Sequence, residues 1–247
     1  MDWMTLLPLM IFGAALLYSS VGHAGASGYI AAMAIAGVAP DVMRPAALVL
    51  NVLVASIGTF RFYRAGRISR PILFPLILGS IPLSFIGGVA QLPGTLYKQL
   101  LGGVLLFAAF RLAFPPTAAT SAPPAESRRI PFVGAVVIGA FIGLLAGLTG
   151  TGGGIFLTPL LLFLRWAEPK ESAGVSVAFI LVNSIAAIAG QLNKLQSLPG
   201  ELPYWALAAV LGGLIGSELG SRRLGNLALR RLLAVVLVIA AGKLIFV

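Results

Sequence analysis

The chain has 247 residues, of which 59% are hydrophobic and only 10% are charged, and its formal net charge is +10. Soluble domains carry about 25% charged residues, so 24 Lys, Arg, Asp and Glu residues are too few to cover a soluble fold of this length. The composition therefore excludes a soluble domain and predicts an all-α, polytopic membrane protein. The chain has no cysteine, which excludes disulfides, thiolate metal sites and cysteine nucleophiles.

The apolar segments fall into two groups of five, separated by one long polar stretch. A bilayer core of about 30 Å needs about 20 apolar helical residues. The segments of the first group are 4–21, 26–38, 43–60, 71–90 and 98–114. Those of the second are 131–149, 154–166, 171–190, 203–217 and 231–247. Residues 115–130, rich in Pro, Ala and Ser, predict a flexible linker, so we expect one repeat over 1–114 and another over 131–247.

The two groups resemble each other in sequence, which predicts an internal duplication. An offset of 128 residues, changed to 132 by an insertion near 221–224, aligns them. The aligned identities include Gly22 with Gly150, Gly25 with Gly153, Ser56 with Ser184, and Pro75 with Pro203. Internal repeats of this kind are the usual construction of secondary transporters.

The distribution of arginine predicts how the segments cross the membrane. Loops 61–70 and 218–231 each contain four arginines, and the linker region contains Arg111, Arg128 and Arg129. All of them lie on the cytoplasmic side only if the short segments 26–38 and 154–166 also cross. The sequence thus predicts ten segments in two inverted five-segment repeats, with both termini outside and the linker in the cytoplasm. Because membrane topology explains the basic loops, we expect no nucleic-acid partner.

A glycine-rich break precedes each short segment. The second is Gly150-Thr151-Gly152-Gly153-Gly154, and the first is Gly22-His23-Ala24-Gly25-Ala26-Ser27-Gly28. Four glycines in five residues oppose a continuous helix by about 1 kcal/mol each relative to alanine. Non-helical backbone at membrane depth must be buried in protein or line a wet cavity. The helix that follows each break presents unpaired N–H groups and a positive dipole end, which favours an anion. A structural kink is the alternative interpretation.

Other glycines have a packing interpretation. Gly139, Gly143 and Gly147 recur every four residues, as do Gly212, Gly216 and Gly220. This spacing is typical of glycines that let two membrane helices approach closely.

The GTGGG break, followed by a short apolar helix that carries Thr158-Pro159, resembles the signature of the TauE/SafE family of sulfite-exporter-like permeases. The resemblance extends over the whole chain, its two halves and its central linker. In the first half, His23-Ala24-Gly25-Ala26-Ser27-Gly28 stands where that family has a richer glycine run. The resemblance implies transport of sulfur-containing anions such as sulfite, thiosulfate or small organosulfonates.

Several polar side chains are candidates for the same site. His23, the only histidine, lies in the first break and is a candidate for proton coupling; a packing role is the alternative. Ser27 and Thr151 are candidate hydrogen-bond donors to an oxyanion or, alternatively, helix caps. The third segments of the two halves contain Asn51, Ser56, Asn183 and Ser184. These four residues are expected either to line the cavity or to link helices.

Ionisable residues add little to this candidate site. The seven acids lie mostly at segment ends or in loops, so no acidic cation relay is evident. Glu218 is interpreted as a helix-end partner of Arg222. Arg44 is interpreted as an interfacial anchor or, alternatively, as a group that gathers anions at the membrane end. We expect no metal site, no cofactor and no catalytic residues.

The leading hypothesis is a secondary transporter in the cytoplasmic membrane, working by alternating access around a midplane site at the two breaks. The alternatives are a passive anion channel and an intramembrane enzyme. The enzyme would need a base beside a nucleophile or a cluster of metal ligands, and a single histidine without cysteine disfavours it.

Overall fold

The computed structural model describes residues 3–20, 22–90, 92–114 and 131–222, together with seven isolated positions between 234 and 245. The described regular structure is entirely helical. It consists of α1 (Trp3–Ser19), α2 (Ala26–Ala36), α3 (Pro40–Arg64), α4 (Arg70–Val89), α5 (Gly94–Ala113), α6 (Phe132–Thr149), α7 (Gly154–Phe163), α8 (Pro169–Ala189), the 3-10 helix η1 (Leu192–Ser197) and α9 (Leu202–Arg222).

These α-helices coincide with the first nine predicted segments. The linker 115–130 lies outside the described residues, as do Arg223, Arg230 and Arg231. Most of the predicted segment 231–247 also lies outside them, although its described positions are helical. Within the described ranges, α3, α4, α6 and α8 are long and apolar enough to cross a membrane. The composition and these helices are those of a polytopic membrane protein.

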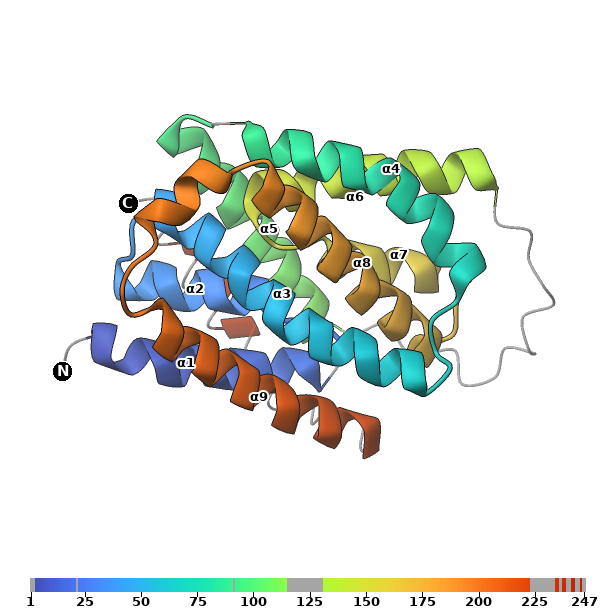
Figure 1. The fold of residues 1–247 in the computed structure, drawn as a ribbon, viewed down its shortest axis with the longest axis horizontal. Helices are drawn as coiled ribbons and strands as arrows, with labels where there is room; N and C mark the ends of the chain where they lie inside the picture. Colours follow the sequence, from blue (N-terminus) through green and yellow to red (C-terminus); the bar gives the residue numbers. More distant parts are fainter. Residues whose placement is uncertain are drawn as a thin grey trace.

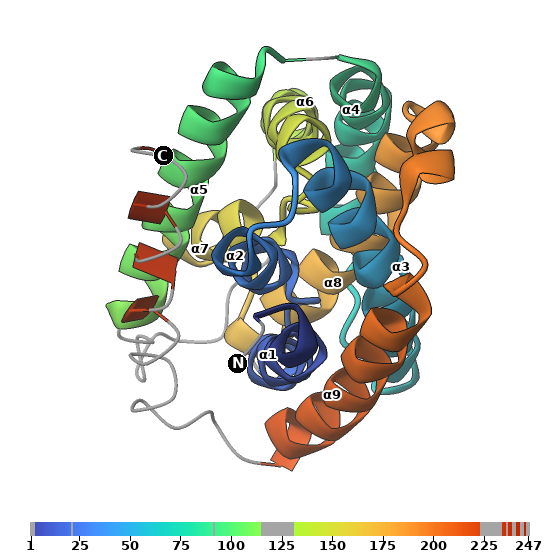
Figure 2. The same cartoon turned by 90° about the vertical axis from the view of Figure 1, so that its left-hand side faces the viewer.

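The two short helices are too short to span a bilayer alone. α2 has 11 residues and α7 has 10, which corresponds to about 15–17 Å of helix, roughly half of a bilayer core. Every residue of α2 from Ala26 to Ala34 is buried, as expected for a helix that is apolar on all sides. Figure 2 shows α2 inside the bundle, with α4 and α6 on one side of it and α1 and α9 on the other.

Two close helix pairs form opposite sides of the bundle, and both depend on glycine. α6 packs on α4, where Gly139, Gly143 and Gly147 face the backbone oxygens of Leu76, Ser80 and Ser84. α9 packs on α1, where Gly212 and Gly216 face the backbone oxygens of Phe12 and Leu16. The packing role predicted for these five glycines is therefore confirmed, while the surroundings of Gly220 lie outside the described side chains.

Between these pairs, α3 and α8 lie side by side at the centre of the molecule (Figure 1). Gly58 of α3 contacts Val177 of α8, because a β-carbon at Gly58 would lie 3.8 Å from that of Val177. α3 also packs on α9, and α8 packs on α4. α3 and α8, the third helices of the two halves, thus bring both halves of the chain together.

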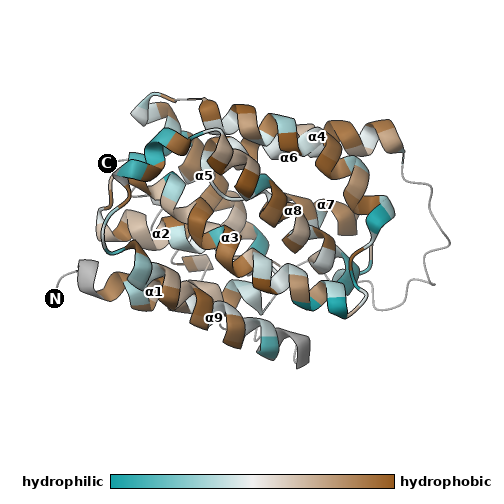
Figure 3. Ribbon diagram, viewed as in Figure 1, coloured by the Kyte–Doolittle hydropathy of each residue, from teal (hydrophilic) through white to brown (hydrophobic). Residues whose placement is uncertain are grey.

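The polar residues gather at the two ends of the bundle. Figure 3 shows hydrophilic residues at the α3–α4 connection on one side and around η1 on the other, with mostly hydrophobic helices between them. This pattern matches a slab of bilayer between two aqueous faces. The α3–α4 connection carries Arg67, and Arg70 begins α4; this end of the bundle is called the arginine-rich face below.

Candidate functional site

The two glycine-rich breaks interrupt the chain as the sequence predicts. α1 ends at Ser19 and α2 begins at Ala26, whereas α6 ends at Thr149 and α7 begins at Gly154. The glycines with positive φ in the two breaks are Gly22 (81°), Gly25 (107°), Gly150 (78°), Gly152 (73°) and Gly153 (83°). L-residues other than glycine rarely adopt this left-handed region, so the local conformation explains why glycine occupies these positions.

Each break presents a run of backbone donors at a helix N-terminus. Among the described residues, no hydrogen-bond acceptor pairs with the backbone N–H groups of residues 24–28 or 151–155. The N-cap residues are Gly25 and Gly153, and neither helix has a side-chain cap. Ser27 and Thr151 therefore do not cap these helices, and the positive dipole end of each helix lies at its break.

The two breaks contact each other through His23. Its Nε2 atom lies 3.2 Å from the backbone oxygen of Gly154 and 3.1 Å from Oγ1 of Thr158. The Thr158 hydroxyl donates to Oγ of Ser176 at 2.8 Å. A carbonyl oxygen can only accept a hydrogen bond, and a hydroxyl that donates to Ser176 must accept from its other neighbour. Both contacts require Nε2 of His23 to carry a proton, so this histidine donates into the second break.

A second polar group adjoins the same break at Gly152. The Nδ2 atom of Asn51 is 3.5 Å from Oγ of Ser184, at the outer limit of a hydrogen bond, and both side chains are fully buried. A β-carbon at Gly152 would lie 2.8 Å from Asn51 Nδ2 and 3.1 Å from Ser184 Oγ. The backbone of Gly152 thus contacts both side chains, one from each half of the chain. Among the described residues, Oδ1 of Asn51 has no hydrogen-bond partner.

The remaining predicted side chains lie farther from this centre or have other partners. The Ser27 hydroxyl donates to the Tyr18 hydroxyl at 2.7 Å, and Thr151 Oγ1 lies 2.9 Å from that of Thr149. Asn183 is buried but donates to a carbonyl of its own helix, Phe179 O, at 2.8 Å. Ser56 is exposed and donates to Val52 O at 2.6 Å, so the structure does not bring its side chain to the breaks.

Arg44 corrects an expectation from the sequence. Instead of anchoring at the interface, it is only 4% exposed and donates to the backbone oxygens of Gly87, Gly88 and Ala90. These carbonyls form the C-terminus of α4, whose negative dipole end compensates a buried cation. Arg44 also contacts the second break, because a β-carbon at Gly150 would lie 3.1 Å from its Cγ. The sequence interpretation was wrong because nothing local shows that α4 ends beside this residue.

Thr158 and Ser176 contact His23 or its partner but were not among the site residues predicted from the sequence. Thr158 lies four residues after Gly154 on α7, so the helical period places it on the same side as the start of the break; this spacing was readable. Ser176 lies on α8 with no periodic signal of its own. Its proximity to His23 follows only from the packing of α8 against α7.

A narrow cavity adjoins His23. Its lining residues are Ser19, Gly22, His23, Val54, Gly58, Phe62, Val177 and Ser217. The volume is about 10 Å³, the scale on which a single water molecule fits. His23 is the only ionisable residue in this lining. Among the described residues there is no group of three His, Cys, Asp or Glu side chains that could hold a metal ion.

Comparisons with known proteins give one family and one relative named as a membrane transporter. The family model described as "Sulfite exporter TauE/SafE" matches residues 7–244. A protein from Sinorhizobium fredii (strain NBRC 101917 / NGR234) named "Probable membrane transporter protein y4hK" is 38% identical over 240 residues, which is 97% of each chain. A search of solved structures gives no significant match.

Proposed function

The chain belongs to the TauE/SafE family of membrane transporters, and from this premise we propose that it is a secondary transporter of sulfur-containing anions. Sulfite, thiosulfate and small organosulfonates are the proposed substrates, bound where the two breaks meet. The observation that carries the proposal is the contact of His23 with Gly154, which joins two unwound segments 131 residues apart. Unwound backbone at membrane depth is where such transporters bind their substrates.

The chemistry of the breaks supports an anion as the substrate. The unpaired N–H groups of residues 24–28 and 151–155 are all donors, and the hydroxyl and amide groups around Gly152 and His23 add further donors. The acidic residues of the described part of the chain lie elsewhere, with Asp41, Glu168, Glu201 and Glu218 exposed and Glu171 half-buried near the start of α8. Hydrogen-bond donors and positive helix ends repel a cation. A sulfur oxyanion is attracted to the helix ends and accepts hydrogen bonds from the donors.

The arrangement of the helices supports the inverted repeat and alternating access. In the predicted repeat, α1 corresponds to α6, α3 to α8 and α4 to α9. The contact of α1 with α9 then corresponds to that of α6 with α4, and the contact of α3 with α9 corresponds to that of α8 with α4. α3 and α8 also run in opposite directions in Figure 1. Two antiparallel halves of this kind can rock around a central site and expose it to either face in turn.

The small cavity favours a carrier over a passive channel. A volume of about 10 Å³ beside His23 holds about one water molecule, and sulfite has four non-hydrogen atoms. An anion that enters through this cavity reaches the breaks only if the helices around it separate. A carrier requires such a step in every cycle, whereas an open channel does not.

Flux measurements in proteoliposomes test the proposal. We expect saturable uptake of labelled sulfite, thiosulfate or a taurine-like sulfonate, accelerated when unlabelled substrate is present on the opposite side. Acceleration by substrate on the other side is a property of carriers. Non-saturable flux without this acceleration would indicate the channel, and the absence of flux for every sulfur anion would refute the proposal.

His23 is expected to couple this flux to pH. Wild-type flux of an organosulfonate, whose sulfonate group stays ionised throughout, should change between about pH 5 and 8, the range in which an unperturbed histidine changes its charge. In His23→Gln the amide can still donate to Gly154 O but cannot titrate, so flux should persist and lose this pH dependence. Thr158→Val, which keeps the histidine but removes its hydroxyl neighbour, serves as the matched variant and should shift the profile without abolishing it. An unchanged profile in His23→Gln would assign the histidine a packing role.

A further inference from the structure

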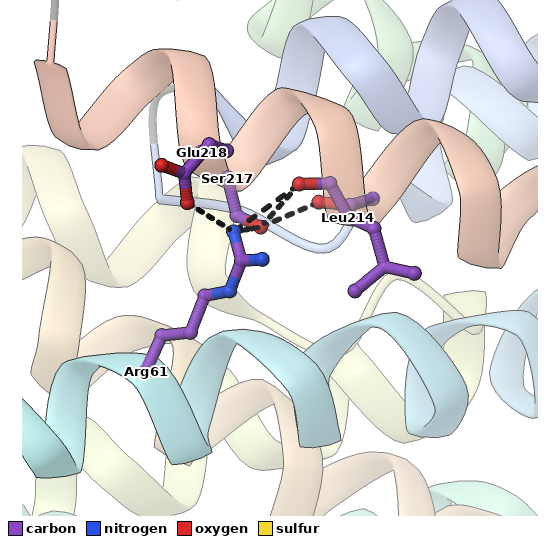
Figure 4. A network of polar contacts seen from close by, with 5 residues as sticks. Arg61, Leu214, Ser217 and Glu218 are labelled. Carbon is purple, nitrogen blue, oxygen red and sulfur yellow. Dashed lines mark hydrogen bonds and ion pairs between the residues drawn. The ribbon is translucent and has the colours of Figure 1, made fainter.

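A polar bridge connects α3 of the first half with α9 of the second half on the arginine-rich face. Nη1 of Arg61 donates to Oγ of Ser217 at 2.7 Å and to the backbone oxygen of Leu214 at 3.2 Å. The same atom lies 3.5 Å from Oε2 of Glu218. Figure 4 shows Arg61 reaching from α3 to these three groups on α9. A single side chain thus joins the two helices at this end of the bundle.

This bridge lies beside the cavity that leads to the breaks. Ser217 accepts from Arg61 and also lines the cavity, together with Val54 and Gly58 of α3. His23 lines the same cavity and contacts Gly154 of the second break. The guanidinium of Arg61 is therefore one side chain away from the cavity that reaches His23 at the proposed binding site.

The carboxylate partner of Arg61 can be replaced by another anion, in contrast to the carbonyl partners of Arg44. The side chains of Arg61 and Glu218 are 35% and 51% exposed, and an ion pair in contact with water is weak. Arg44 is buried and held by three carbonyls of a helix end. An anion that arrives from the aqueous face can replace the Glu218 carboxylate at little cost, but it cannot replace the buried carbonyls.

We propose that Arg61 is the first binding group for the anion on the arginine-rich face. The oxygens of the substrate replace the Glu218 carboxylate on the guanidinium, whose planar set of donors suits an oxyanion with two or more oxygens. Loss of the carboxylate contact weakens the bridge, and α9 then separates from α3 and opens the cavity toward His23. The inference rests on the proposed transport function, for which it names an entry site and a gate.

The first test compares the KM for substrate supplied on the arginine-rich face. Arg61→Gln should raise this KM about tenfold or more, the effect of losing one charge-assisted contact. Glu218→Gln should lower it, because the variant removes the competing carboxylate but keeps an amide that can accept from Arg61. Arg64→Gln is the matched control, since Arg64 lies one turn away on α3, stacks over Phe60 at 5.7 Å and should leave the KM unchanged. An unchanged KM in both Arg61→Gln and Glu218→Gln would overturn the proposal.

The second test locks the two helices together, which the absence of native cysteine makes possible. A β-carbon at Gly213 of α9 would lie 2.9 Å from Cγ1 and 3.3 Å from Cγ2 of Val54 on α3. These contacts put the two β-carbons within the reach of a disulfide, about 4.5 Å. The double variant Val54→Cys, Gly213→Cys should lose flux on oxidation and recover it on reduction. The two single variants under the same oxidant are the controls.

The outcomes separate this inference from the proposed function. Full flux in the oxidised double variant would show that α9 need not leave α3 and would overturn the gate. Wild-type protein without saturable flux of any sulfur anion would instead refute the transport function itself. Reversible loss of flux, together with opposite KM changes in Arg61→Gln and Glu218→Gln, would support the gate and the entry site.

Discussion

Replacement of Gly152 by valine is expected to reduce anion flux by about a hundredfold or more without preventing membrane insertion. Gly152 has a φ of 73°, a conformation that costs an L-residue about 1–2 kcal/mol and a β-branched residue more. Its β-carbon would also meet Asn51 Nδ2 and Ile180 Cγ2, each at 2.8 Å. The substitution therefore distorts the break and displaces the two polar side chains that approach it. Gly152→Ala should have the same effect in weaker form, about tenfold.

The measurement is substrate flux per inserted protein in proteoliposomes. Gly103 provides the matched control, because it is an exposed helical glycine of α5 with no atom within 4 Å of its would-be β-carbon. Gly103→Val and Gly103→Ala should transport at the wild-type rate. If Gly152→Val transported as fast as these controls, the second break would not form part of the substrate site.

The second large effect is on stability rather than transport. A β-carbon at Gly143 of α6 would lie 2.6 Å from the Cα of Ser80 on α4, and backbone cannot rotate away as a side chain can. Gly143→Val must push the two helices apart, which removes their close packing along the whole pair. Overpacking of a tight core costs about 1–3 kcal/mol, so we expect the melting temperature to fall by at least about 5 °C.

Thermal unfolding in detergent, followed by circular dichroism, measures this effect. Gly103→Val again serves as the control, because it introduces the same β-branched residue into a helix without a backbone contact. A melting temperature of Gly143→Val equal to that of this control would contradict the close α4–α6 packing.

Most of the helices followed from the sequence because hydrophobicity and chain length determine them directly. A run of about 20 apolar residues in a bilayer has to satisfy its backbone internally, and only a helix does so within one segment. The first nine predicted segments are helices for this reason, with ends that differ by a few residues, as for α3, predicted over 43–60 and found over Pro40–Arg64. Helix ends depend on the loops, where hydrophobicity gives no signal.

The candidate site was only partly readable. The glycine runs located the breaks, because glycine is the residue that tolerates positive φ. The sequence also identified His23, Asn51 and Ser184 as candidates for one site, but not the partners of His23 within it. It did not indicate that Thr158 and Ser176 would meet the histidine, or that Ser56 would be exposed on the outer surface.

Arg44 and Arg61 show most clearly what a sequence cannot resolve. Both are arginines on α3, yet one is buried against the carbonyl end of α4 and the other bridges to α9 in partial contact with water. Glu218 likewise contacts Arg61, 157 positions away, whereas the side chain of its predicted partner Arg222 lies outside the described ones.

By itself, the sequence determined the bilayer environment, the helical class, the positions of the helices and the two places where helix fails. These properties depend on local composition and on the cost of unpaired backbone in an apolar medium. Only the tertiary structure decided that the two breaks contact each other through His23, and which polar groups surround them. Such contacts depend on how close helices can approach and at what angle they cross, which is set by small residues on partner helices far away in the chain.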